Sequence, residues 1–339
     1  MTEPIQVLIT LPFPETLVAK LRAVSPRLKF HLIRAHRPEE ISPELWSQVE
    51  VLYTNRVFPR PEQAPNLRWI QLHLAGADHA LDAPILEKPG LVTTTLSGAA
   101  ASQMAEYIVM MLLALGRRMP EFLAYQKRGE WPKDRWDRFS PRELRDSTVG
   151  IIGYGSVGRQ LARLLHPFGA RVLASKRDVM HPEDEGYMPE EMGDPTGDLV
   201  HRLYPPEALR SMVKLSDFVV VTVPLTPNTR SLVDAEVLAA LKPSAFLVDV
   251  SRGGVVDHMA LVSALRDRRF AGAALDVFPE EPLPADSPLW KLPNVILTPH
   301  IAGNTPYYDE RATDLFAENL RRYLAGLPLY NRIEQERGY

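Results

Sequence analysis

A glycine-rich turn at residues 153–158 is the feature of this sequence that most directly suggests chemistry. In a GxGxxG pattern the first glycine permits a tight turn, the second lets the backbone approach a pyrophosphate, and the third lets a helix pack closely on a strand. An apolar run precedes the turn and a helical pattern follows it, so a helix N-terminus is available for the phosphates. The turn therefore predicts a dinucleotide site made of Gly153, Tyr154, Gly155, Ser156, Val157 and Gly158.

The residues about 20 positions after the turn indicate which dinucleotide binds. An acidic residue there would bind the ribose hydroxyls of NAD and repel the 2′-phosphate of NADP. This sequence has Ser175, Lys176 and Arg177, a hydroxyl and two cations suited to charge-assisted hydrogen bonds with a phosphate. NADP is therefore favoured over NAD. In the alternative, Lys176 and Arg177 are only solvated and Asp178 binds the ribose of NAD.

A sheet must position these residues, and residues 148–298 contain the strands for one. Their apolar runs are continuous, which predicts parallel strands covered on both faces. Helical patterns separate the runs, so we expect the α/β class and a Rossmann-type doubly wound sheet. The predicted strands are Thr148–Ile152, Arg171–Ala174, Phe218–Val223, Ala245–Val250, Gly272–Leu275 and Val295–Thr298, and the helical patterns are Val157–Leu165, Pro206–Lys214, Ala235–Leu241 and Met259–Arg266.

The first hundred residues predict a second α/β sheet, because short β-type runs alternate with polar stretches compatible with helices. These runs are Ile5–Ile9, Leu28–Ile33, Val51–Tyr53, Trp69–Leu74 and Leu91–Thr95. An amphipathic helical pattern at Pro306–Leu324 comes after the last strand of the other sheet. We expect this last helix to pack back on the first domain.

Three segments do not fit this alternation. Ala101–Met119 predicts a helix that is apolar on nearly every face and therefore buried all round, either in the core between domains or at a subunit interface. Trp131–Arg145 has no clear period and is expected to connect the domains. Asp178–Tyr204 is polar and longer than a loop between strand and helix requires, so we expect a surface excursion.

Three stretches of the second half resemble the D-isomer-specific 2-hydroxyacid dehydrogenase family. They are VDVSRGGVVD at residues 248–257, ALDVFPEEPL at 274–283 and LTPHIAG at 297–303. With the glycine turn, Val223–Thr226 and the loop Ala75–Asp78, the resemblance covers nearly the whole chain. Three spaced motifs in the same order are far more specific than one glycine turn.

The resemblance also implies a domain organisation. Residues 1–102 and 304–339 would form a flavodoxin-like substrate-binding domain, and residues 103–303 a dinucleotide-binding Rossmann domain. The two would be joined by a hinge. The resemblance further implies a homodimer built on the dinucleotide-binding domain, with the apolar helix after Ala101 near the interface.

Reduction of a 2-oxo acid needs a cation for the carboxylate and carbonyl, and a proton donor for the alkoxide that forms. The resemblance implies that Arg252 binds both oxygen groups, His300 donates the proton and Glu281 pairs with the imidazole. A carboxylate in that place would hold the imidazole tautomer and favour the charged donor. The hydride comes from the nicotinamide. The backbone amides of Ala75 and Gly76 match the loop that receives the substrate carboxylate.

The same resemblance assigns the nicotinamide pocket. Asp276 matches the residue that contacts the carboxamide, and Val223, Pro224 and Val250 match the pocket walls. The sequence departs from the family at Lys176, where the acid that reads NAD is missing.

The composition excludes several other classes of function. A formal net charge of -3 gives no electrostatic support for nucleic-acid binding. The sequence has no cysteine, which excludes disulfides and thiolate chemistry and agrees with a reducing compartment. We see no signal peptide, and the longest apolar run, Ile108–Leu115, is far shorter than the roughly 20 residues that cross a bilayer. We therefore expect a cytoplasmic protein without membrane, nucleic-acid or metal partners.

The predicted function is reduction of a small 2-oxo acid, such as glyoxylate or hydroxypyruvate, to a D-2-hydroxy acid with NADP or NAD. Oxidation of phosphoglycerate, formate or phosphite on the same scaffold is an alternative. A second alternative is a dinucleotide-sensing corepressor, in which ligand binding controls assembly and no substrate is turned over.

Overall fold

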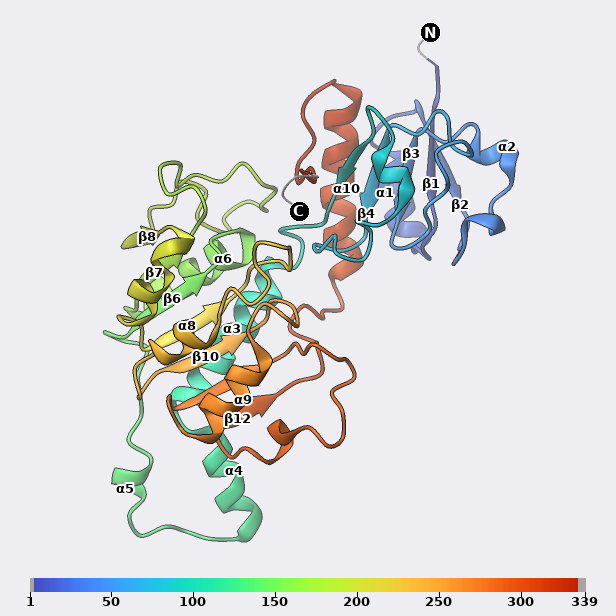
Figure 1. Ribbon diagram of the computed structural model, residues 1–339. Coiled ribbons are helices and arrows are strands. Elements are labelled where there is room, and N and C mark those ends of the chain that lie inside the picture. The colour runs from blue at the N-terminus through green and yellow to red at the C-terminus, as the bar shows by residue number, and fades with distance from the viewer. Residues whose placement is uncertain (1–2, 335–339) are drawn as a thin grey trace. The chain divides into compact units, whose positions relative to one another are not determined.

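The computed structural model describes residues 3–334, and the chain divides into two compact units. Within the described part, one unit comprises residues 3–100 and 305–334, and the other comprises residues 101–304. The boundaries expected from the sequence, after residue 102 and before residue 304, lie within two residues of these. Each unit is built on its own parallel sheet (Figure 1).

The first unit contains a five-stranded sheet in the order β2-β1-β3-β4-β5, which is the flavodoxin-like order. Every strand lies at an apolar run that predicted it. The strands are β1 (Ile5–Ile9), β2 (Leu28–Leu32), β3 (Val51–Thr54), β4 (Trp69–Leu72) and β5 (Val92–Thr94). The helices are α1 (Glu15–Arg22), α2 (Pro43–Trp46) and α10 (Tyr308–Leu324), with 3-10 turns η1 (Pro38–Glu40) and η2 (Pro84–Glu87).

The last helix, α10, packs on the sheet of the first unit, as its amphipathic pattern predicted (Figure 1). Its Phe316 and Leu320 are fully buried. The Phe316 ring centroid lies 4.7 Å from that of Tyr53 and 5.3 Å from that of Trp69. Burial of each such side chain contributes about 1.5–3 kcal/mol, so this face holds the C-terminal helix firmly on strands from the beginning of the chain.

The second unit contains seven strands in the order β12-β11-β10-β9-β6-β7-β8. All neighbouring strands are parallel. The order reverses between β6 and β9, and ligands of doubly wound sheets bind at such a switch point, beyond the carboxyl ends of the strands. The strands are β6 (Thr148–Ile152), β7 (Arg171–Ser175), β8 (Arg202–Tyr204), β9 (Phe218–Val221), β10 (Phe246–Asp249), β11 (Gly272–Leu275) and β12 (Val295–Leu297).

Helices cover both faces of this sheet, which confirms the doubly wound α/β class. The hydrophobic cluster on one face includes side chains of α3 (Ala101–Gly116) and α6 (Ser156–Leu165). The cluster on the other face includes side chains of α7 (Leu209–Val213), α8 (Ala235–Ala239) and α9 (His258–Arg266). The remaining helical elements are α4 (Met119–Arg128), α5 (Arg135–Arg138), η3 (His166–Phe168), η4 (Pro206–Ala208) and η5 (Pro288–Lys291).

Within the single chain, helix α3 is not buried all round, and the alternative that a subunit interface covers it stays a prediction. Ile108 and Leu112 of α3 are fully buried, but Met110 is 52% exposed and Leu113 is 38% exposed. The helix ends at Gly116, where an added Cβ would lie 2.4 Å from the carbonyl oxygen of Arg142. In Figure 1, α4 and α5 extend away from the sheet of their unit.

The segment expected as a surface excursion also differs from the prediction. Its last three residues form β8, which pairs with β7 at the edge of the sheet, and Tyr204 is buried. We call residues 178–201 the long connection. Asp194, within it, is only 3% exposed. The polar composition hid the strand because most of the segment is held by polar contacts, and only its end packs on the apolar core, with Leu203 and the buried Tyr204.

Within residues 3–334, no helix is both long enough and apolar enough to cross a membrane.

Candidate active site

The glycine turn has the geometry that the motif requires. Gly153 has φ +105°, and an added Cβ would lie 2.8 Å from Cγ1 of Val223. At Gly158 an added Cβ would lie 2.3 Å from the carbonyl oxygen of Gly153, so only glycine allows α6 to lie this close to the turn. A Cβ at Gly155 would meet no described atom within 4 Å. The open side of the turn is therefore at Gly155, beside the N-terminus of α6, which leaves room for a pyrophosphate.

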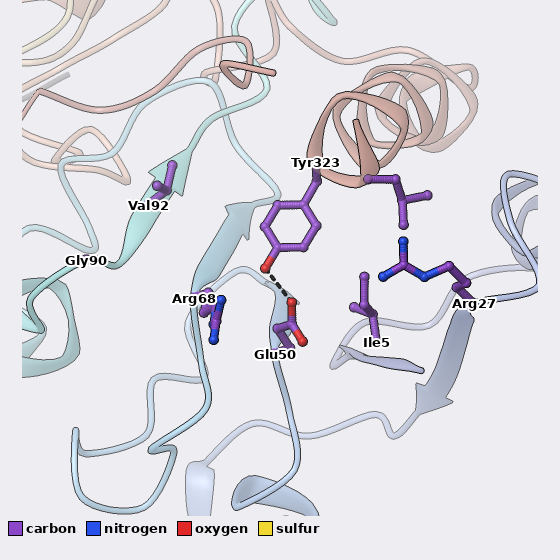
Figure 2. A pocket seen from close by; sticks show the side chains of 8 residues that line it. Ile5, Arg27, Glu50, Arg68, Gly90, Val92 and Tyr323 are labelled. Atoms are coloured by element: carbon purple, nitrogen blue, oxygen red, sulfur yellow. Dashed lines mark hydrogen bonds between the residues drawn. The ribbon is translucent and has the colours of Figure 1, made fainter. Parts of the chain in front are cut away.

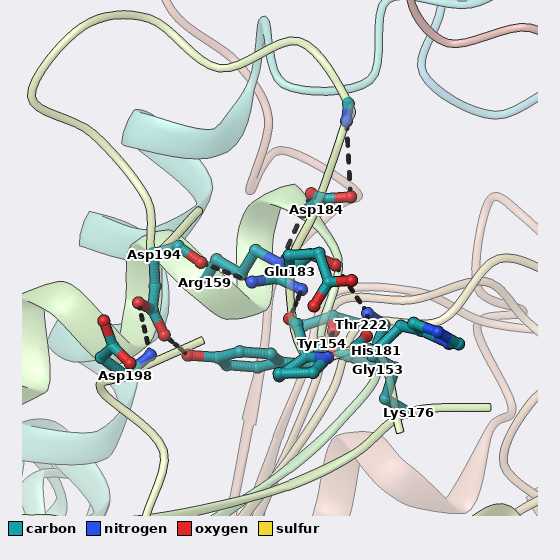
Figure 3. Close-up of polar contacts among 12 residues, drawn as sticks. Gly153, Tyr154, Arg159, Lys176, His181, Glu183, Asp184, Asp194, Asp198 and Thr222 are labelled. Carbon is teal, nitrogen blue, oxygen red and sulfur yellow. Dashed lines mark hydrogen bonds and ion pairs between the residues drawn. The ribbon is translucent and has the colours of Figure 1, made fainter. Parts of the chain in front are cut away.

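The triplet Ser175, Lys176 and Arg177 begins with the last residue of β7 and lies next to the turn. The amide of Gly153 donates to the carbonyl of Ser175 at 3.1 Å. The ammonium group of Lys176, however, binds the long connection: it donates to the carbonyls of His181 and Glu183, the latter at 2.8 Å (Figure 3). Burial, together with the nearby Arg159 guanidinium, lowers the pKa of Lys176. Lys176 therefore has a structural role here that the sequence did not predict.

The carboxylate of Asp178 binds the beginning of the long connection. Its carboxylate accepts from Nδ1 of His181 at 2.7 Å and from the amide of Met180 at 3.0 Å. The hydrogen bond from His181 lowers the pKa of Asp178, and in turn the pKa of His181 is raised. Arg177 is exposed at the end of the triplet.

A buried arginine on α6 binds the long connection. Arg159, the residue after Gly158, is only 1% exposed. Its guanidinium donates to the carbonyl of Asp194 and, at 2.5 Å, to that of Pro182, and its Nε lies 3.4 Å from a carboxylate oxygen of Asp184 (Figure 3). The guanidinium also lies 4.7 Å from the ring centroid of Tyr154. Carbonyl dipoles, one carboxylate and an aromatic face thus replace the water that the buried cation lost.

Tyr154, inside the glycine turn, binds the same connection. Its hydroxyl donates to Oδ2 of Asp194 at 2.5 Å, and that carboxylate also accepts the amides of Asp198 and Leu199 (Figure 3). Burial and the hydrogen bond to Asp194 raise the pKa of Tyr154. The turn and the long connection are consequently one hydrogen-bonded structure.

The three predicted catalytic residues lie at one edge of the sheet. Arg252 follows β10, Glu281 follows β11 and His300 follows β12, and these strands are neighbours with their carboxyl ends together. The Nδ1 atom of His300 lies 2.7 Å from Oε2 of Glu281. The other oxygen of Glu281 accepts the amide of Phe278 at 2.9 Å. Because Glu281 binds Nδ1, the Nε2 atom of His300 remains for a substrate.

His300 is exposed and has an unusual backbone conformation. Its side chain is 43% exposed, and its φ is +53°, in the left-handed region that residues with a Cβ rarely adopt. Such a conformation persists only where neighbouring contacts hold it. We refer to residues 298–303 as the His300 loop.

Asp276 supplies several of these contacts. It directly follows β11, is 1% exposed, and accepts the amides of Ile301 at 2.9 Å and Ala302 at 2.8 Å. It also accepts the hydroxyl of Thr298 at 2.6 Å. The residue that the sequence assigns to the nicotinamide carboxamide thus also holds the His300 loop.

A second buried aspartate holds the turn that carries Arg252. Asp249 ends β10 and accepts both the amide of Ser251, at 3.0 Å, and its hydroxyl, at 2.5 Å. The Arg252 guanidinium donates to the carbonyl of Ser251 at 2.9 Å. Burial raises the pKa of Asp249 to about 6, against the effect of the hydrogen bonds from Ser251.

The predicted walls of the nicotinamide pocket lie at the same edge. Val223 and Pro224 follow β9, and Val250 follows β10. Val223 lies so close to Gly153 of the turn that no side chain would fit between them. All residues predicted for the dinucleotide thus lie at or just after the carboxyl ends of β6, β7, β9, β10 or β11.

Ala75 and Gly76 belong to the first unit, in the loop after β4. Just before them, His73 accepts or donates a hydrogen bond with the hydroxyl of Tyr53 at 2.7 Å, and its carbonyl accepts the hydroxyl of Tyr308 at 3.0 Å. Burial lowers the pKa of His73, and burial also raises that of Tyr53. This polar cluster fixes the strand end from which the loop departs.

A separate cavity of about 390 Å³ in the first unit contains none of the predicted site residues. Figure 2 shows Arg27, Arg68 and Glu50 around it, with the hydroxyl of Tyr323 donating to Glu50 at 2.6 Å. Glu50 and Arg68 directly precede β3 and β4, so the cavity lies at the amino ends of these strands. The loop with Ala75 follows the opposite, carboxyl end of β4.

Sequence reasoning missed Arg159, Asp194, Asp249 and the hydroxyl of Thr298 as parts of the site. Asp249 and Thr298 stand inside the family-like stretches and could have been found there. The others bind groups far away in sequence, and no local pattern marks them.

A glycine turn on a Rossmann-type sheet, with an arginine and a paired glutamate and histidine at the same edge, defines a nicotinamide dinucleotide-dependent oxidoreductase. Comparison with known proteins agrees. Residues 109–302 match the NAD-binding domain of D-isomer specific 2-hydroxyacid dehydrogenases.

Two curated relatives and one solved structure illustrate the similarity. A glyoxylate reductase from Thermofilum pendens is 36% identical over 269 residues, which are 78% of this chain and 74% of that protein. A D-3-phosphoglycerate dehydrogenase from Methanocaldococcus jannaschii is 34% identical over 266 residues, 78% of this chain but only 47% of that protein. The crystal structure of a D-isomer specific 2-hydroxyacid dehydrogenase from Xanthobacter autotrophicus Py2, in complex with NADPH and MES, is similar with a TM-score of 0.80 and 31% identity, and covers 100% of both chains.

The chain belongs to the D-isomer specific 2-hydroxyacid dehydrogenase family. The matched residues 109–302 are the dinucleotide-binding domain of that family, and they include the glycine turn and the Glu281–His300 pair.

Proposed function

We propose that the protein reduces a small 2-oxo acid, such as glyoxylate or hydroxypyruvate, to the D-2-hydroxy acid with NADPH. The observation that carries this proposal is the pairing of Glu281 with Nδ1 of His300 at 2.7 Å, at the sheet edge that also carries Arg252 and the glycine turn. A positioned imidazole and a guanidinium are the groups that reduction of a carbonyl beside a carboxylate needs.

In this proposal each residue has a separate role. The nicotinamide supplies the hydride when it is bound. Nε2 of His300 donates a proton to the oxygen of the reduced carbonyl, while Glu281 holds the ring and favours its charged form. Arg252 binds the substrate carboxylate and polarises the carbonyl. For the first unit, we propose that the backbone amides of Ala75 and Gly76 bind the same carboxylate.

The preference for NADP follows from the triplet after β7, which has no acidic residue to repel a 2′-phosphate. The relative from Xanthobacter autotrophicus Py2 has NADPH bound, which supports this choice. Because Lys176 binds carbonyls of the long connection, we assign the phosphate contact to Arg177 and Ser175 first.

A homodimer formed through the second unit would cover the exposed apolar side chains of α3. Met110 and Leu113 are 52% and 38% exposed, and the following α4 exposes Leu123. Large apolar side chains gathered on one surface are typical of an interface. Light scattering of the purified protein at several concentrations tests this, and a monomer at every concentration contradicts it. We also propose that the protein acts in the cytoplasm.

A steady-state screen of 2-oxo acids with NADPH and NADH tests the function. We expect turnover with glyoxylate or hydroxypyruvate and a higher kcat/KM with NADPH. An arm with 3-phosphoglycerate and oxidised cofactor tests the activity of the archaeal relative. Cofactor binding without turnover of any 2-oxo acid would refute the reductase and favour the dinucleotide-sensing alternative.

A further inference from the structure

Helix α3 contacts both ends of the His300 loop. The side-chain amide of Gln103 donates to the carbonyl of Gly303 at 3.1 Å. The hydroxyl of Tyr107 lies 2.5 Å from the hydroxyl of Thr298. Gln103 and Tyr107 are four residues apart, so they lie on one face of the helix, one turn from each other. Two side chains one helical turn apart therefore bind the two ends of the loop.

The direction of the hydrogen bonds at Thr298 follows from its single proton. Thr298 donates this proton to Oδ1 of Asp276 at 2.6 Å, because the carboxylate can only accept. The hydrogen bond with Tyr107 must then have Tyr107 as the donor. Burial raises the pKa of Tyr107 to about 12. The phenol therefore keeps the proton that it donates at neutral pH.

Asp276 connects Thr298, which lies before His300, to the backbone that follows His300. It accepts the amides of Ile301 and Ala302, the two residues after His300, while Thr298 lies two residues before it. His300 thus lies between backbone positions that one buried carboxylate and one tyrosine hydroxyl fix. This explains how its left-handed φ of +53° is maintained on an exposed loop.

We propose that Tyr107 and Gln103 are positioning residues for the proton donor. Tyr107 orders Thr298 and Asp276, Gln103 holds the carbonyl of Gly303, and together they fix the backbone that aims the imidazole of His300. The inference rests on the proposed function only in that His300 is taken as the donor. The hydrogen-bonded structure itself can be measured without any turnover.

The first experiment compares Tyr107→Phe with Tyr323→Phe. Both variants lose one half-buried phenol hydroxyl with a raised pKa, but Tyr323 binds Glu50 in the first unit and has no part in the proposed site. In the ligand-free protein, we expect amide exchange of the peptide covering residues 298–303 to be about fivefold faster in Tyr107→Phe, as loss of one hydrogen bond predicts, and unchanged in Tyr323→Phe.

The second measurement is kinetic. We expect kcat of Tyr107→Phe to fall about fivefold, with the dissociation constant of NADPH within twofold of wild type, because the hydroxyl orients the donor and does not bind the cofactor. Tyr323→Phe should keep both values. Faster exchange with unchanged kcat, or unchanged exchange, contradicts the positioning role. If no 2-oxo acid is turned over by the wild type, the proposed function fails while the exchange result still decides the hydrogen-bonded structure.

Variants of Thr298 guard against a general effect on folding. Thr298→Ser keeps the hydroxyl and should retain near wild-type exchange and kcat. Thr298→Val has nearly the same shape without the hydroxyl, and we expect about a tenfold loss of kcat because a bond to a charged group is lost as well. Equal losses in Ser and Val variants would mean that packing of the methyl group, and not the hydrogen bonds, holds the loop, which overturns the proposal.

Discussion

Two segments of the second unit, the His300 loop and the long connection, are each held by a buried charged side chain of opposite sign. Asp276 is 1% exposed and accepts two backbone amides and a hydroxyl of the His300 loop. Arg159 is also 1% exposed and donates to two backbone carbonyls of the long connection. In both cases hydrogen bonds to the backbone replace the hydrogen bonds to water that the charged group lost on burial.

The two segments differ in how much chain one charge must hold. Asp276 holds a loop of a few residues, so its hydrogen bonds set the position of a single side chain. Arg159 holds the much longer residues 178–201 at two carbonyls, with help from Lys176 and from Tyr154 through Asp194. A short loop with a buried acid is suited to placing a reacting group, whereas the long connection is suited to covering a surface. The following variants test that difference.

The largest effect is expected from His300→Ala. If the His300 loop exists to place one proton donor, kcat should fall about 10²- to 10⁴-fold, while the dissociation constant of NADPH changes little. Stopped-flow or steady-state kinetics and fluorescence titration of NADPH measure the two quantities. His166→Ala, an exposed histidine of the same unit, is the control and should behave as wild type. Activity near wild type in His300→Ala would refute the assignment of the donor.

A pH series of unfolding tests the second buried acid, Asp249. Because its pKa in the folded state is about 6, above the usual 3.8, its contribution to stability is present below about pH 4 and is lost as the pH rises through 6. Asn cannot ionise and loses no stability in this way. As the pH rises from 4 to 7, the free energy of unfolding of Asp249→Asn should therefore increase by about 2–3 kcal/mol relative to that of the wild type.

Urea unfolding at each pH measures this difference. Asp286→Asn, which changes an exposed acid, is the control and should show no such trend. A difference between Asp249→Asn and wild type that does not change with pH would mean that burial does not raise the pKa of Asp249 above its usual value.

Replacement of Arg159 by methionine should release the long connection. Loss of hydrogen bonds from a charged group, worth about 2 kcal/mol, predicts roughly 30-fold faster cleavage by a Glu-specific protease between residues 178 and 201. Arg210→Met removes an arginine whose ion pair with Glu236 is exposed, and it should leave cleavage unchanged. If both variants are cleaved at the wild-type rate, Arg159 does not hold the connection.

The smallest effects separate the two cations after β7. Arg177→Ala should weaken NADPH about tenfold and leave NADH unchanged, as loss of one charge-assisted contact predicts. Lys176→Met should weaken both cofactors alike, by a few-fold, because its ammonium group binds carbonyls of the long connection. Titration of both cofactors to each variant measures this. If Lys176→Met lost affinity for NADPH but not for NADH, the contact with the 2′-phosphate would be assigned to Lys176 and not to Arg177.

The sheets could be predicted from the sequence almost completely, because buried parallel strands are continuous apolar runs. Strand β8 is the exception. Arg202–Tyr204 is a three-residue edge strand that follows a polar segment, and its pairing with β7 depends on the contacts of that segment. Neither pattern nor length distinguishes it from a loop.

The site could be predicted where spacing along the chain carries the chemistry, as in the glycine turn and in Glu281 and His300. It could not be predicted where the partner is distant. Tyr107 meets Thr298 across 191 positions and Arg159 meets Asp194 across 35, so only the folded chain shows these pairs. The contacts of Lys176 with the long connection could not be predicted for the same reason, and its role in cofactor binding stays a prediction.

Arg159 and the long connection depend on each other for their hydrogen bonds. A closed loop can change length at small entropic cost, so β7 and β8 would tolerate many lengths between them. The guanidinium, however, has these two carbonyl acceptors only when the connection is present. Shortening the connection would therefore leave a buried cation without its acceptors, although the entropy of loop closure alone would permit it.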